Sequence, residues 1–336
     1  MGAAVATQTL TNNTQIPLSI AVWLADSTYD HQDEIPNYIS VTSLLKSPRQ
    51  LVLGSRLNAG NFEAVDVADK MASKFGTAVH DSIEDAWVNR YQENLLRLGY
   101  PGHIVERILV NPEPHHLYEG CIPIYMEKRS YMTVGKYTIG GKFDFVGDGI
   151  LDDFKSTGVY SYTSGCNEWK YRLQLSLYRW LNPDIITSDH ANIQFIFTDW
   201  KKHEALYKAS KGYPSTRMHQ HKVRLMSVPE TDLWVRRKLE HIDLLMDAPE
   251  TELPLCDRQD LWQDECVYKY YRNPEKLTRS SGNFDTMAEA TIKWIEDGRK
   301  GVIKEVYGPA KGCLYCEAFK LCSQKDQLIA DGTLKF

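Results

Sequence analysis

Apolar and polar residues alternate in two neighbouring runs near the middle of the chain, residues 142–146 and 150–155. Such alternation predicts β-strands, and the Asp-Gly dipeptide between the two runs is a typical hairpin turn. Because successive side chains of a strand point to opposite faces, Asp153 and Lys155 share one face, whereas Asp152 points to the other. We therefore expect Asp153, rather than Asp152, to be the acidic partner of Lys155.

Segments with helical spacing lie on both sides of this hairpin. Before it, His80 and Glu84 are one turn apart in a run with a helical pattern. After it, the apolar residues of the run 171–181 recur at helical spacing and place Gln174 and Tyr178 on one face. Either pair alone is a weak signal, because polar side chains on helices more often serve the structure than bind a ligand.

The two predicted strands carry acidic residues that suit metal chemistry. Asp144 lies on the first strand and Asp153 on the second, and carboxylates of adjacent strands can share a hard cation. The ammonium group of Lys155 can then orient or deprotonate a bound water, while the metal neutralises charge that develops on a phosphate. The alternative is a solvated hairpin with ordinary surface charges. The order of all these segments along the chain decides between the two.

In that order, the segments resemble the RecB-like branch of the PD-(D/E)XK nucleases. Four sequence blocks of this branch occur here in sequence within roughly a hundred residues, which makes chance agreement improbable. Two departures from the pattern are that no proline precedes Asp144 and that residue 153 is aspartate where many relatives have glutamate. The four blocks read Gly76/His80/Glu84, Gly141/Asp144, Asp153/Lys155 and Gln174/Tyr178.

The resemblance implies an α/β fold with a restriction-endonuclease-like core, a mixed central sheet flanked by helices, and helical additions at both ends. It implies that Lys155 positions the attacking water, and that Gln174 and Tyr178 hold the scissile phosphate or the lysine. It also implies a site for one or two Mg²⁺ or Mn²⁺ ions. The ligands of that site would be His80, Asp144, Asp153, the backbone carbonyl of Phe154 and, as a further candidate, Glu84.

The expected activity is that of a metal-dependent DNA nuclease acting in replication, recombination, repair or degradation of host DNA. An exonuclease is favoured because end-processing enzymes dominate the RecB-like branch, and the chain is similar to stand-alone bacteriophage exonucleases. A structure-specific or single-strand endonuclease, and an inactive nucleic-acid-binding protein, are the alternatives. No helicase motif occurs in the sequence, so a helicase, a recombinase or a single-strand-binding protein is the expected kind of partner.

A cluster of three cysteines near the C-terminus, within residues 313–322, forms a second motif. Its spacing C-x-x-C-x-x-x-x-x-C lets one short segment surround a soft metal centre. It resembles the tail of RecB-like nucleases that hold a [4Fe-4S] cluster, namely the CRISPR-associated members and the nuclease subunit of AddAB. In those proteins a fourth cysteine precedes the core in a C-P-R segment, and here Ser47 takes that position.

Several outcomes stay open for these cysteines. The fourth ligand of an iron–sulfur or zinc site could be Cys256 or Cys266, or an oxygen or nitrogen group such as that of Ser47 could complete an iron–sulfur site. The cysteines could also pack as small hydrophobic residues without a metal. We favour a structural metal centre, with iron–sulfur ahead of zinc. The three clustered residues are Cys313, Cys316 and Cys322.

The charge of the chain is negative overall, −5 at pH 7, but DNA contact requires only local positive charge. Basic residues interleaved with rings gather in the segment 201–224, which suits phosphate neutralisation and base stacking. The alternative is a solvated, mobile loop. The predicted DNA-contacting residues are Lys201, Lys202, Lys208, Lys211, Arg217, Lys222 and Arg224, with Arg49 as a weaker candidate.

We expect an N-terminal arm over residues 1–40, a nuclease core over 41–225 and a helical C-terminal region over 226–336. Within them, the apolar patch 16–24 suggests a strand or arm, 230–246 and 286–297 suggest helices, and 254–274 suggests irregular structure. The sequence has no membrane-spanning apolar run and no secretory signal. An odd number of cysteines argues against a disulfide framework, so a cytoplasmic location, in a cell or an infected host, is expected.

Overall fold

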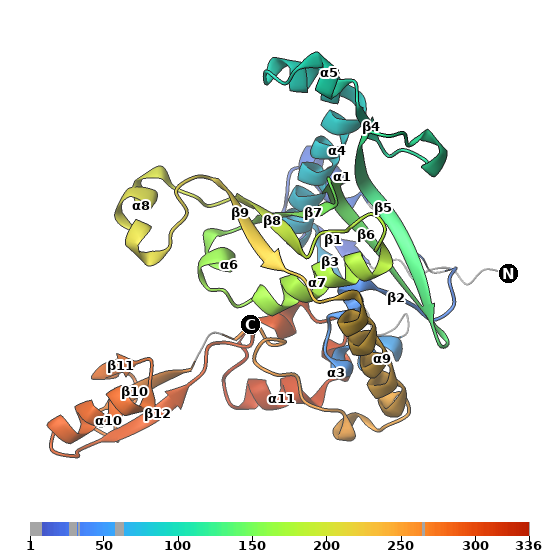
Figure 1. The fold of residues 1–336 in the computed structure, drawn as a ribbon. Helices are drawn as coiled ribbons and strands as arrows, with labels where there is room; N and C mark the ends of the chain where they lie inside the picture. The colour runs from blue at the N-terminus through green and yellow to red at the C-terminus, as the bar shows by residue number, and fades with distance from the viewer. Residues whose placement is uncertain (1–8, 27–31, 33, 58–63, 264–265, 336) are drawn as a thin grey trace. The chain divides into compact units, whose positions relative to one another are not determined.

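The computed structural model describes all residues except 1–8, 27–31, 33, 58–63, 264–265 and 336, and it shows an α/β fold (Figure 1). The chain forms two compact units. The first unit consists of residues 1–45 and 62–240, and the second of residues 46–61 and 241–336. The described residues 46–57 are grouped in the second unit, with the residues after 240. In the described part of the chain, no helix is long and apolar enough to cross a membrane.

The first unit contains most of the regular structure. Its first elements are β1 (Leu10–Thr11), α1 (Leu18–Ala25), β2 (Tyr38–Ser40), α2 (Val41–Leu44), β3 (Val65–Asp66), η2 (Val67–Lys70), α4 (Met71–Arg97), α5 (Gly102–Val105), β4 (Ile108–Val110) and η3 (Pro114–His116). They are followed by β5 (Ile122–Val134), β6 (Tyr137–Gly147), β7 (Ile150–Thr157), α6 (Val159–Thr163), α7 (Glu168–Leu181), β8 (His190–Phe197), α8 (Lys202–Tyr207), η4 (Ala209–Lys211) and β9 (Met218–Arg224). Helix α9 (Val228–Leu245) begins in this unit and ends in the second.

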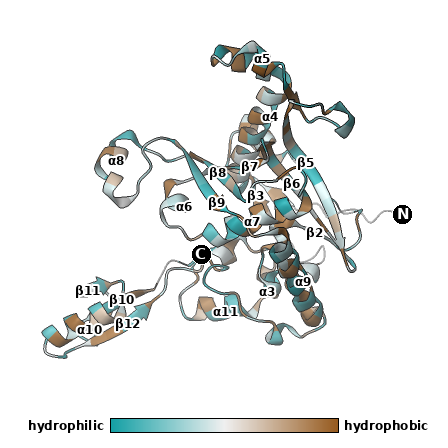
Figure 2. Ribbon diagram, viewed as in Figure 1, coloured by the Kyte–Doolittle hydropathy of each residue, from teal (hydrophilic) through white to brown (hydrophobic). Residues whose placement is uncertain are grey.

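A mixed sheet forms the centre of the first unit. Among the described residues it has seven strands, in the order β4-β5-β6-β7-β8-β9, with β2 paired to β6 beside this path. The β5-β6, β6-β7 and β8-β9 pairs are antiparallel, whereas β4-β5, β7-β8 and β2-β6 are parallel. Strand β9 is at the edge of the sheet, and Figure 2 colours it mostly hydrophilic.

The predicted hairpin is confirmed as the β6-β7 pair, in which Phe145 lies opposite Asp152. Asp148 and Gly149 form its turn with φ angles of 50° and 73°, the left-handed values that a two-residue hairpin turn requires. A Cβ atom at Gly149 would lie 2.2 Å from Thr187 Oγ1. This turn therefore needs glycine both for its backbone angle and for its close neighbour.

Helix α7 covers one face of this sheet and confirms the helical pattern of the run 171–181. Its leucines and Trp180 are buried, whereas Trp169 near its start is exposed, and truncation of Leu177 to alanine would cost about 2–5 kcal/mol. Gly141 on β6 allows the helix to approach, because a Cβ there would lie 2.9 Å from Tyr178 Cε1 and 2.6 Å from Val41 Cγ2. The glycine of the second sequence block is thus explained by packing.

Helix α4 packs against the sheet, where it contacts β7, and it carries His80. Ile83, Trp87, Tyr91 and Leu95, spaced at helical intervals, contact a small core formed by Ile108, Ile124 and Met126. Along the rest of the helix the side chains are partly or fully exposed. The contact stripe fixes the rotation of α4 about its axis and thereby the direction in which His80 points.

The second unit contains α3 (Pro48–Ser55), η5 (Glu250–Glu252), β10 (Val267–Tyr271), β11 (Gly282–Phe284), α10 (Met287–Glu296), β12 (Val302–Val306), η6 (Lys311–Tyr315), η7 (Phe319–Leu321) and α11 (Ser323–Ala330). Strand β10 is the middle of an antiparallel three-stranded sheet. The helix predicted over 286–297 is confirmed as α10, and Thr286 caps its first turn.

Two sequence expectations are corrected by these elements. The patch 16–24 forms helix α1, whose Ala21 packs with Val67, instead of a strand or arm. The segment 254–274 contains strand β10, so it is not irregular throughout. The helix predicted over 230–246 is present as part of α9, where Leu233 is 49% exposed whereas Val235 and Leu239 are buried.

Candidate metal centre

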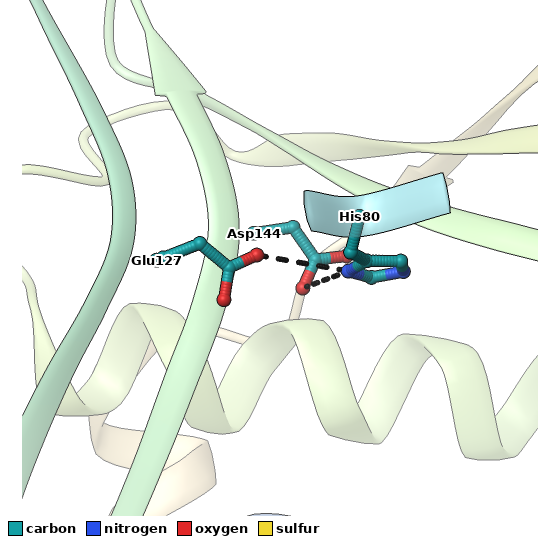
Figure 3. A group of neighbouring side chains, drawn as sticks. All are labelled: His80, Glu127 and Asp144. Carbon is teal, nitrogen blue, oxygen red and sulfur yellow. Dashed lines mark ion pairs between the residues drawn. The ribbon is translucent and has the colours of Figure 1, made fainter. Parts of the chain in front are cut away.

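Three side chains of the first unit form a group that could hold a metal ion: His80 from α4, Glu127 from β5 and Asp144 from β6 (Figure 3). One ligand atom of each lies within 4.8 Å of the others. His80 Nδ1 is 3.6 Å from Glu127 Oε1 and 3.6 Å from Asp144 Oδ1. One nitrogen and two carboxylate oxygens are donors that suit a divalent cation.

Glu127 is part of this group because of the register between β5 and β6. Met126 pairs with Phe145 and Lys128 pairs with Phe143, so Glu127 lies opposite Asp144. Glu127 also has a φ angle of 48°. A left-handed backbone at a residue other than glycine costs roughly 1–3 kcal/mol, and outside turns such residues cluster at functional sites.

Sequence reasoning missed Glu127, although a signal for it exists. Gly135 and Lys136 form a two-residue turn that places Val134 opposite Tyr137. Counting back seven positions on one strand and forward seven on the other pairs residue 127 with residue 144. The register of the hairpin, rather than a motif, would have identified this ligand.

The backbone of Phe154 contacts both His80 and Asp144. Its N–H donates to Asp144 Oδ2 over 2.7 Å, and its carbonyl oxygen lies 3.1 Å from His80 Nε2. If Nε2 carries the proton and donates to that carbonyl, the lone pair of Nδ1 faces the two carboxylates, as in most metal-binding histidines. The carbonyl predicted as a metal ligand thus acts in this structure as the hydrogen-bond acceptor that orients His80.

Asp153, Lys155, Gln174 and Tyr178 form a second set of contacts on β7 and α7. Lys155 Nζ lies 2.7 Å from Asp153 Oδ2. Gln174 Nε2 donates to Asp153 Oδ1 over 3.4 Å and to the Tyr178 hydroxyl over 3.1 Å. The face-sharing of Asp153 and Lys155 that strand alternation predicted is therefore confirmed.

Asp153 is 1% exposed, and within the described residues its Oδ2 accepts no well-directed hydrogen bond, although the Lys155 ammonium is close. A buried carboxylate normally uses all its lone pairs. Among the residues that the structure describes, Oδ2 faces only the Lys155 ammonium, and a carboxylate oxygen has a second lone pair with which it can ligate a cation. Asp153 is outside the group of three described above, as is Glu84, the further candidate from the sequence.

The electrostatics of the site favour a bound cation. Burial, together with the charge of Asp153, raises the pKa of Asp144 to about 7. The hydrogen bond to Glu127, with the charge of Asp144, raises the pKa of His80 to about 8 although burial opposes it. Burial lowers the pKa of Lys155, but Asp153 and Asp144 outweigh it, so the net shift is upward. Part of the rise in the pKa of Asp144 comes from the charge of Asp153, and a bound cation would relieve this repulsion between the two carboxylates.

The basic residues predicted to contact DNA in the segment 201–224 differ in their surroundings. Lys201 and Lys208 both form ion pairs with Glu204. On β9, Lys222 and Arg224 are exposed on one face, and His219 and His221, earlier on the strand, point to the other. His219 pairs with Phe195, which pairs with Lys155, so this histidine shares the sheet face of the catalytic candidates.

Arg49 and Lys211 differ from the other predicted DNA contacts. Arg49 is 1% exposed and its guanidinium binds Glu250, so its predicted contact with DNA is corrected. Lys211 has a side chain outside the described part of the structure, so its predicted DNA contact stays a prediction.

The chain was compared with protein families, curated proteins and solved structures. No protein-family model and none of the curated proteins match this chain. Among solved structures, that of the protein SSO0001 is similar over 73% of this chain and 98% of its own, with a TM-score of 0.39 and 14% sequence identity. A similarity at this level does not indicate a function.

Proposed function

We propose that the first unit is a metal-dependent nuclease that hydrolyses phosphodiester bonds of DNA from an end, and that its sheet is a PD-(D/E)XK core. One observation carries the proposal: the ion pair of Lys155 with buried Asp153, beside the His80, Glu127 and Asp144 group. Acidic ligands with an adjacent lysine suit metal-assisted attack of water on a phosphate.

His80, Asp144 and Asp153, with Glu127 as an additional ligand, would hold Mg²⁺ or Mn²⁺. The donors fit such an ion because three of the four are carboxylates, two of them buried, and because Asp153 Oδ2 has a lone pair to give. The bound ion would supply Lewis-acid stabilisation of charge on the phosphate and a more acidic water.

The protein's own residues would position the reactants. Phe154 fixes Asp144 through its N–H and His80 through its carbonyl, so the two ligands share one rigid support. Lys155 would orient the attacking water next to Asp153. Gln174, held between Asp153 and the Tyr178 hydroxyl, would keep this carboxylate directed towards the ion.

End-labelled linear DNA and circular DNA incubated with Mg²⁺ or Mn²⁺ test this function. We expect progressive loss of linear DNA, while circles resist. Rapid cutting of circles would instead support an endonuclease. Asp153→Asn and Lys155→Ala should each lower the rate by more than about 100-fold, the range expected when a group that stabilises the transition state is lost.

Asp152→Asn provides the matched control for these variants. Asp152 is on the same strand but points to the opposite face, where it accepts hydrogen bonds from Asn192 and Gln194. This variant should digest DNA at the wild-type rate. Equal loss of activity in all three variants, with unchanged circular dichroism, would contradict the proposed roles, and so would full activity of Asp153→Asn.

A further inference from the structure

Four cysteines of the second unit line one cavity. Three of them belong to the predicted C-terminal cluster, and the fourth, Cys256, is more than fifty positions earlier in the chain. Cys266, the other fourth ligand considered from the sequence, is not among the residues that line this cavity. The four are Cys256, Cys313, Cys316 and Cys322.

Cys256 is fixed beside the cluster by a two-point contact with a buried side chain. Its backbone N–H donates to Gln324 Oε1 over 2.8 Å, and Gln324 Nε2 donates to its carbonyl oxygen over 2.9 Å. Gln324 is 6% exposed and is two residues after Cys322. The last cysteine of the cluster and Cys256 are thereby held in one arrangement.

Ser47 lies next to Cys256. The distance between Ser47 Oγ and Cys256 Sγ is 3.2 Å. As the N-cap of α3, Ser47 already accepts a hydrogen bond from the Gln50 N–H over 3.1 Å. Its hydroxyl proton is therefore available for the sulfur, and a sulfur at position 47 would lie close to the place that the Cys256 sulfur occupies.

A buried cation also points at these sulfurs. The Arg49 guanidinium forms an ion pair with Glu250, donates to the Leu253 carbonyl over 3.1 Å, and donates through Nε to Cys322 Sγ over 3.2 Å. Four neutral thiols do not require a buried arginine. A metal centre bound by four thiolates is negatively charged, and hydrogen bonds to its sulfurs are a recognised means of tuning it.

We propose that Cys256, Cys313, Cys316 and Cys322 bind an iron–sulfur cluster, with Cys256 as the ligand that replaces a cysteine at position 47. Three cysteines in one short run plus one distant cysteine is a spacing that iron–sulfur proteins use, whereas structural zinc sites usually combine two close pairs. Four thiolates are the donor set that such a cluster takes. Ser47 and Arg49 act as hydrogen-bond donors to the ligand sulfurs. The inference concerns the second unit and does not depend on the proposed nuclease function.

A ligand-exchange experiment tests this assignment. The full chain is purified without air, and iron, zinc, acid-labile sulfide and visible absorption are measured. The wild type should contain iron and sulfide and absorb visible light. Cys256→Ser should lose most of the iron, and adding Ser47→Cys to Cys256→Ser should restore it, because the two side-chain atoms are 3.2 Å apart in the wild type.

Cys266→Ser is the matched control and should keep the wild-type iron content. Restoration by the double variant also separates a lost ligand from a misfolded protein, because both variants carry the same serine at position 256. The proposal is overturned by zinc without iron in the wild type, by full iron content in Cys256→Ser, or by iron loss in Cys266→Ser. A Cys256→Ser variant that keeps the wild-type circular dichroism spectrum but is not restored by Ser47→Cys would overturn the ligand exchange.

Discussion

The two candidate metal sites of this protein differ in their donors and in what holds those donors. In the first unit, a histidine and carboxylates project from a long helix and paired strands. In the second unit, thiols project from short 3₁₀ turns and connecting segments, and Gln324 and Arg49 hold these in place. Nitrogen and oxygen donors suit an exchangeable hard cation, whereas four thiolates suit a soft, resident centre.

Protonation separates the two sites further. Asp144 has a pKa of about 7, so near neutral pH little free energy is needed to ionise it for a cation. Burial raises the pKa of Cys256 to about 12 and that of Cys313 to about 11. A metal must displace protons that these thiols hold firmly, so only a strongly bound centre would occupy them. The comparison suggests a catalytic ion that exchanges and a structural centre that stays.

Chelation should give the largest effect and should separate the two sites directly. Brief treatment with EDTA should abolish DNA hydrolysis, and Mn²⁺ should restore it, because the ion of the first unit exchanges. Iron and sulfide content should not change during the same treatment. Loss of both together, or activity that survives the chelator, would contradict the division into an exchangeable and a resident site.

Glu127→Gln should give the next largest effect, because Glu127 is one of the three residues of the candidate metal group. It is also the one that the sequence blocks did not contain. We expect the affinity for Mn²⁺, measured by isothermal titration calorimetry, to fall about 10- to 100-fold, as for the loss of a group that supports a metal site. Glu84→Gln should have a smaller effect, since Glu84 is outside the group of three. Glu93→Gln, at an exposed position of α4, is the control. A wild-type affinity in Glu127→Gln would remove Glu127 from the site.

Whether a part of either site could be predicted from the sequence depends on how far apart along the chain its contacting residues are. The hairpin, the shared face of Asp153 and Lys155, and the contact of Gln174 with Tyr178 depend on local periodicity, and the structure confirms them. Glu127 depends on strand register across a hairpin, which local periodicity does not fix. Register can still be counted from a tight turn, so this ligand was within reach of the sequence.

Cys256 and Arg49 were harder to interpret for a different reason. Their roles depend on contacts between segments about two hundred positions or more apart, such as Ser47 with Cys256 and Arg49 with Cys322. No spacing rule selects Cys256 over Cys266 when chain distance is the only guide. Arg49 resembled a surface DNA contact because burial of a charge is rare, and only its partners explain the exception.

The two candidate metal sites should also differ in how metal binding depends on pH. A bound cation requires Asp144 ionised and His80 neutral. The pKa values of about 7 and about 8 for these groups mean that protons compete below and near neutrality. Mn²⁺ affinity should therefore rise between pH 6 and pH 8, while iron content stays constant over this range. Affinity that is constant, or that falls as pH rises, would show that these two groups do not ligate the ion.

Ser47→Ala should give the smallest effect and tests the role of the hydroxyl next to Cys256. Loss of an N-cap costs about 1 kcal/mol, so the second unit should unfold at a slightly lower denaturant concentration. The cluster itself should remain, because alanine removes a donor and leaves all four thiolates. A hydrogen bond to a ligand sulfur stabilises the reduced, more negative state, so its removal should lower the reduction potential, measured by redox titration of the visible spectrum. Thr286→Ala is the control, since it removes the N-cap of α10 in the same unit at a residue that does not line the cysteine cavity. If both variants lower the stability but leave the potential unchanged, Ser47 serves the helix alone and Cys256 has no hydrogen-bond donor in position 47.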